Sequence, residues 1–100
     1  MANQTQEIVF NIKNQNRGVV IARTLPPTNT KGKRIVVTTP TMNPQLRYVT
    51  SWDYGLNEAP NFEEAFKQAL ALWISEGADY LNNRTYVMGY TKDGYALVTL

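Results

Sequence analysis

Residues 61–82 read NFEEAFKQALALWISEGADYLN, and this stretch decides the fold. At 100° per residue its apolar side chains gather on one face and its polar side chains on the other. The apolar stripe comprises Phe62, Phe66, Ala69, Leu70, Trp73, Gly77 and Tyr80. The polar face comprises Glu64, Lys67, Gln68, Ser75 and Asp79. The pattern predicts one long amphipathic helix.

The sequence admits more than one interpretation at each end of this helix. Asn61 can cap the first turn, and Glu64 follows three residues later, where the partner in a capping box belongs. Gly77 can either end the helix as a left-handed cap or lie on its buried face. Because the apolar spacing continues to Tyr80 and Leu81, we expect the helix to continue through Gly77.

Most of the remaining chain alternates between apolar and polar residues with the period of a strand. Strands are predicted at residues 7–13, 19–25, 34–39 and 46–54 before the helix, and at residues 84–90 and 95–100 after it. Turn residues at 14–18 predict a hairpin between the first two strands, and Lys92-Asp93-Gly94 predicts one between the last two.

These elements predict an α+β fold in a single domain, residues 1–100, with residues 1–6 as a polar N-terminal arm. We expect a mainly antiparallel sheet of five to six strands, with one long helix packed on one face and the order ββββ-α-ββ. A chain of this length suffices for one hydrophobic core.

Alternation also divides the strand residues between two faces. We expect the helix to cover Ile8, Phe10, Ile12, Val19, Ile21, Ile35, Val37, Leu46, Tyr48 and Trp52. The opposite face would carry Val9, Asn11, Lys13, Val20, Ala22, Thr24, Arg34, Val36, Thr38, Arg47, Val49 and Ser51. The last hairpin fits either face, because Tyr86, Met88 and Tyr90 are amphipathic or apolar. The second face is a candidate binding surface.

The composition excludes several classes of function. The chain has no cysteine and no histidine, which excludes zinc, haem and iron–sulfur sites built on these residues, and also Ser-His-Asp and Cys-His catalysis. The basic stretch 30–34 lacks the glycines and the following helix of a phosphate-binding loop. Carboxylate metal sites and acid–base pairs remain open by composition, and Asp53 and Glu58 could form a small acidic cluster, although surface charges near a helix start explain these two residues better. We therefore expect no enzymatic activity, no catalytic residues, no metal and no cofactor.

The charges are distributed unevenly along the chain. Residues 1–50 carry seven basic residues and one acidic residue, whereas residues 51–100 carry three basic and seven acidic residues. Such a division favours either an anion-binding surface or complementary self-association. The candidate residues for binding a macromolecule are Lys13, Arg17, Lys31, Lys33, Arg34 and Arg47.

Two functions fit this pattern. We place first a non-catalytic protein-interaction module, either an assembly subunit or a small inhibitor, that binds a protein partner or self-associates into a homo-oligomer. By analogy, such traits are common among viral accessory and structural proteins. The alternative is direct binding of nucleic acid, preferably single-stranded, although exposed aromatic residues for base stacking are few.

With no membrane-spanning run and no signal segment, we expect an intracellular, cytoplasmic protein.

Overall fold

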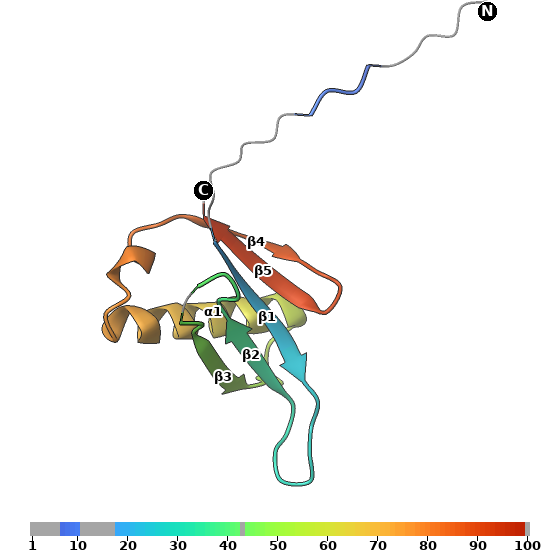
Figure 1. Ribbon diagram of the computed structural model, residues 1–100. Helices are drawn as coiled ribbons and strands as arrows, with labels where there is room; N and C mark the ends of the chain where they lie inside the picture. The colour runs from blue at the N-terminus through green and yellow to red at the C-terminus, as the bar shows by residue number, and fades with distance from the viewer. Residues whose placement is uncertain (1–6, 11–17, 43, 100) are drawn as a thin grey trace, which may run out of the picture.

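The computed structural model describes residues 7–10, 18–42 and 44–99. Five strands form one antiparallel sheet in the order β3-β2-β1-β5-β4, and helix α1 crosses one of its faces (Figure 1). The elements are β1 (Val19–Leu25), β2 (Arg34–Thr38), β3 (Arg47–Ser51), α1 (Glu58–Ser75), the short 3₁₀ helix η1 (Asp79–Leu81), β4 (Tyr86–Tyr90) and β5 (Gly94–Thr99). The predicted α+β fold, with an antiparallel sheet and one helix between strands, is confirmed.

Helix α1 begins one turn earlier than predicted, and Asn61 is not its cap. Asn57 holds the N-cap position, and its side chain makes no capping hydrogen bond. Asn61 is buried in the helix instead. Its Oδ1 accepts a hydrogen bond from the Asp53 amide, and its Nδ2 donates to the carbonyls of Asp53 and Leu56. The asparagine therefore ties the β3–α1 connection to the first turns of the helix.

The helix ends at Ser75, so the expected continuation through Gly77 is wrong. Gly77 has φ +112°, a backbone conformation that residues with a Cβ rarely adopt. The Gly77 amide donates to the Ile74 carbonyl and the Ala78 amide to the Trp73 carbonyl, which is the pattern of a Schellman cap. The apolar spacing that predicted continuation arises because η1 follows and places Leu81 in the core.

The core lies between α1 and the sheet, and the helical stripe was predicted correctly in its first three turns. Phe62, Phe66, Ala69 and Trp73 are all buried there. The sheet contributes Val20, Ala22, Ile35, Val37 and Leu97. Tyr86 and Met88 pack against this cluster, which resolves the face of the last hairpin.

Strand β1 presents the opposite face from the one predicted. Val20 and Ala22 point toward the helix, whereas Val19 and Ile21 point away, because Ala22 is directly paired with the core residue Val37. Residues 19–22 are all apolar, so alternation does not encode their face. Ala22 is also paired with Tyr95. We infer that a small residue is needed there, because the Tyr95 ring packs 4.6 Å from the Phe62 ring.

The predicted pairing of residues 7–13 with β1 is also wrong. Strand β1 pairs with β2 along one edge and with β5 along the other, so neither edge is free for a further strand. Residues 7–10 form no strand, and residues 11–13 lie outside the described part of the chain. The predicted β4–β5 hairpin is confirmed, with Tyr90 paired to Tyr95 around the turn.

Gly94 is required at this hairpin because β5 passes close to β1. A Cβ on Gly94 would lie 2.0 Å from the carbonyl oxygen of Ala22, and only glycine permits such an approach.

Among the described residues, neither helix has the length and hydrophobicity of a membrane span.

Candidate interaction surface

The face of the sheet opposite α1 is the strongest candidate for a functional surface, and we call it the open face. Directly paired residues in antiparallel strands project to the same side, so the register assigns every position. The open face carries Val19, Ile21, Arg23 and Leu25 of β1, Arg34, Val36 and Thr38 of β2, Arg47, Val49 and Ser51 of β3, Val87 and Gly89 of β4, and Gly94, Ala96 and Val98 of β5.

Three arginines lie on this face, one on each of three neighbouring strands. Arg23 is directly paired with Val36, and Arg34 lies two residues from Val36 along β2. Arg23 and Arg34 are thus diagonal neighbours, with Cα atoms about 7–8 Å apart. Arg47 lies at the other end of the face on β3, about 14 Å from Arg34 by strand geometry. The backbone positions of the three arginines therefore flank an apolar centre, and Nε of Arg34 donates a hydrogen bond to the Gly32 carbonyl at 3.3 Å.

That centre is Val36, which is only 1% exposed although it is absent from the core cluster under the helix. Its direct neighbours across the sheet are Arg23 and Val49. The aliphatic stems of arginines commonly cover apolar surface while the charged ends remain in water. We infer that Val36 is covered in this way, which leaves the guanidinium groups at the surface.

The other half of the open face is uncharged. Val19, Val98 and Val87 form one directly paired row, and Ile21, Ala96 and Gly89 form the next. Val87 and Val98 are exposed. None of the strand residues assigned to the open face is acidic. The surface thus combines a basic half on β1–β3 with an apolar half on β5 and β4.

Of the residues predicted to bind a macromolecule, the four that the structure describes do not share one surface. Arg34 and Arg47 share the open face, as predicted. Lys31 lies exposed in the β1–β2 loop. Lys33 projects away from the open face, since its Nζ lies 3.7 Å from the centre of the Trp52 ring. Lys13 and Arg17 lie outside the described residues.

Arg23 is the residue that the sequence analysis missed. It is exposed at the middle of the sheet, next to Val36. The sequence analysis missed it because the wrong face assignment of β1 placed Arg23 on the core side. The charge of Arg23 itself was the signal against that assignment, because an arginine is rarely buried without a partner.

Within the described part of the chain, no exposed aromatic side chain occupies a strand position on the open face. Phe10 lies in the segment 7–10, Tyr54 follows β3, Tyr80 belongs to η1, and Tyr90 projects to the helix side, where its ring packs edge-on against Tyr95 at 6.5 Å. Burial raises the pKa of Tyr95 above its ordinary value, and the neighbouring Glu58 carboxylate raises it further. The open face therefore lacks the aromatic platform on which single-stranded bases stack.

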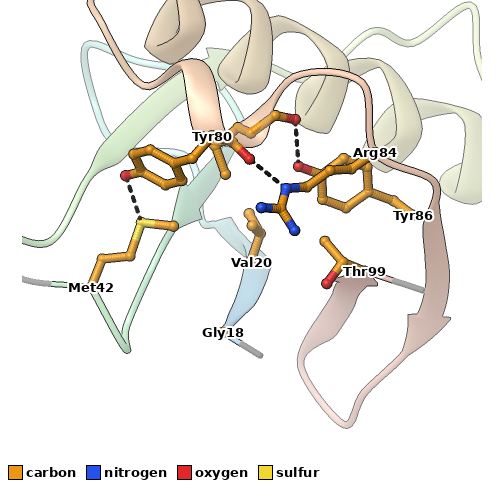
Figure 2. Close-up of a pocket in the computed structure, with 8 residues that line it drawn as sticks. Gly18, Val20, Met42, Tyr80, Arg84, Tyr86 and Thr99 are labelled. Atoms are coloured by element: carbon orange, nitrogen blue, oxygen red, sulfur yellow. Dashed lines mark hydrogen bonds between the residues drawn. The ribbon is translucent and has the colours of Figure 1, made fainter. Parts of the chain in front are cut away.

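A cavity of about 250 Å³ lies beneath η1 at the end of the sheet where β1 begins (Figure 2). Its lining includes Val20, Leu81, Tyr86 and Arg84. The Tyr86 hydroxyl donates to the Leu81 carbonyl at 2.8 Å, and Nε of Arg84 donates to the Tyr80 carbonyl. Burial raises the pKa of Tyr86, while the Arg84 charge opposes this shift. These hydrogen bonds hold η1 against the segment that leads into β4.

The lining of this cavity holds no carboxylate, histidine or cysteine, the side chains that most often act as general acids and bases. Across residues 7–10, 18–42 and 44–99, no group of three or more acidic, histidine or cysteine side chains could hold a metal ion. Comparison with protein-family models, with curated proteins and with solved structures finds no match to this chain.

Proposed function

We propose that this chain is a non-catalytic protein-interaction module whose open face binds an acidic surface of a partner protein. The observation that carries the proposal is the open face itself, with Arg23, Arg34 and Arg47 around a buried valine and no acidic strand residue beside them. Interfaces combine an apolar centre with charged residues that steer the partner and fix its orientation. Arginine is also the cation most suited to bidentate contacts with carboxylates.

Direct binding of nucleic acid is the second candidate, and the exposed Lys31 beside Arg34 favours it. Phosphate binding needs cations and little else, so the arginines would serve it equally well. Two features favour a protein partner over nucleic acid. The open face has no aromatic side chain, and its β4–β5 half is apolar and uncharged. Valine and alanine contribute to protein interfaces by burial but add little to a contact with phosphates.

The test compares two triple variants with the same change in net charge. The first replaces Arg23, Arg34 and Arg47 by serine, and the second replaces the dispersed Lys31, Lys67 and Lys92. Each wild-type or variant chain is immobilised and exposed to nuclease-treated lysate, and captured proteins are identified by mass spectrometry. The proposal requires a protein that binds the wild type and the dispersed variant but not the open-face variant.

Nucleic acid is tested separately by gel shift with single- and double-stranded oligonucleotides at two salt concentrations. Binding that falls steeply with salt, and that both triple variants weaken, would replace the protein proposal with the nucleic-acid one. A third variant, Val49→Thr, keeps the β-branched shape and the charge while adding a polar group directly beside the apolar centre at Val36. This variant should lower the affinity for a protein partner and leave the affinity for nucleic-acid phosphates unchanged.

A further inference from the structure

Residues 7–10 carry three consecutive apolar side chains that are almost fully solvated. Ile8 is 71% exposed, Val9 71% and Phe10 77%. None of the described hydrogen bonds involves this segment, and Figure 1 shows it away from the sheet. Contiguous exposed apolar residues are uncommon on soluble proteins and typically mark an interaction site. In an extended strand, Ile8 and Phe10 would project to one side and Val9 to the other.

The sheet offers an edge that fits such a strand. Strand β4 pairs only with β5, so its other edge is free among the described strands. Its sequence, YVMGY, has neither a proline nor a charged residue, which are the usual devices that keep an edge strand from pairing. An extended segment can therefore add to β4 through main-chain hydrogen bonds.

A groove runs beside this edge on the helix side. It has a volume of about 400 Å³ and lies between α1 and the β4–β5 hairpin. Phe66, Leu70, Met88 and Leu97 line its floor and walls. Glu63 and Lys67 lie at its border, with their charged groups 3.3 Å apart. The groove is thus a largely apolar site next to an unpaired edge.

We propose that residues 7–10 of one copy of this chain add as a strand to the β4 edge of a second copy. Ile8 and Phe10 would enter the groove beside Met88, and Val9 would join Val87 on the open face. Among the described residues, one chain presents both an exposed apolar segment and an acceptor edge with an apolar groove beside it. A reciprocal exchange between two copies therefore satisfies both and closes the assembly as a dimer.

Engineered cysteines give the sharpest test, because the chain contains none of its own. We mix the single variants Phe10→Cys and Met88→Cys under mild oxidation and examine the product by non-reducing electrophoresis. The proposal requires a covalent heterodimer that forms faster than in a control mixture of Phe10→Cys with Leu72→Cys. Leu72 is an exposed apolar residue of α1 outside the groove. Equal rates in the two mixtures would overturn the proposal.

Placing both cysteines in one chain distinguishes a second copy from self-docking. In the Phe10→Cys/Met88→Cys variant, a cross-linked dimer supports exchange between copies. A monomer containing an internal disulfide would overturn it, because the arm would then occupy its own groove.

Sedimentation measures the same interaction without a cross-link. Replacing Ile8 and Phe10 by serine should weaken the dimer at least about 100-fold, since burial of each large side chain contributes roughly tenfold or more. The Leu72→Ser control should leave the dimer unchanged. A wild-type chain that remains monomeric at millimolar concentration would refute the proposal. The result is independent of the partner proposed above, because the exchange uses none of the three arginines.

Discussion

Replacing Asn61 by alanine should lower the free energy of unfolding by about 3 kcal/mol. The Asn61 side chain is 4% exposed and bonds the Asp53 amide at 2.9 Å, the Asp53 carbonyl at 2.8 Å and the Leu56 carbonyl at 3.0 Å. Each hydrogen bond contributes about 1 kcal/mol net, and alanine would leave all three backbone groups without this partner. Asn57 provides the matched control, because its side chain makes no capping bond at the helix start. Asn57→Ala should change stability by no more than about 0.5 kcal/mol.

Urea denaturation followed by the fluorescence of the two tryptophans measures both variants. An Asn57→Ala variant as destabilised as Asn61→Ala would refute this prediction, since the asparagine at the N-cap position would then stabilise the helix as much as the buried one. A third variant, Asn61→Asp, keeps the shape but places a carboxyl against backbone carbonyls, which raises its pKa above the unfolded value. Its destabilisation should therefore be largest at neutral pH and should shrink as the pH falls and the carboxyl is protonated.

Three further predictions concern the core and its borders. Trp73→Ala should cost about 3–5 kcal/mol, because Trp73 is 3% exposed, whereas Leu72→Ala on the solvent side should cost less than about 1 kcal/mol in the same urea titration. Gly77→Ala should cost about 1 kcal/mol or more through the positive φ alone, since nothing lies within 4 Å of the added Cβ. A loss below about 0.3 kcal/mol would argue against the Schellman cap. Burial favours the neutral form of Tyr86, so stability should fall as the pH rises above the unfolded tyrosine value near 10. Urea midpoints between pH 9 and 11 should fall less steeply in Tyr86→Phe, and an identical slope would contradict the effect of burial.

The helix shows which parts of the fold the sequence encodes locally. The stripe of Phe62, Phe66 and Trp73 defined the helix and its buried face, because large apolar side chains at this spacing have few alternatives. The helix ends were wrong for a related reason. Asn61 suits a cap in isolation, but burial against the Asp53 backbone gives it more hydrogen bonds inside the structure. Gly77 interrupts an apolar spacing that η1 resumes by a different backbone path.

The candidate surface was predictable only in part, because its composition depends on the register of strands distant in sequence. Alternation placed Arg34 and Arg47 on one face correctly, since β2 and β3 mix charged and apolar residues. In β1 the run from Val19 to Ala22 is apolar throughout, so only the pairing with β2 and β5 assigns Arg23 to that face. The edge positions of β3 and β4 likewise follow from tertiary pairing and from no local signal.

The three arginines and the β4 edge lie in different parts of one sheet, so contacts of a partner with the arginines and strand exchange at β4 can operate together. The arginines lie on β1, β2 and β3, whereas strand exchange adds to β4, with β5 between the two regions. An added strand would place Val9 beside Val87 and thereby widen the apolar half of the open face without approaching Arg34 or Arg47. A dimer would also present two basic surfaces to one partner assembly, and the second contact would then form at high effective concentration. Loss of the donor side chains Ile8 and Phe10 should therefore weaken binding to a multivalent partner while leaving binding to a single acidic site unchanged.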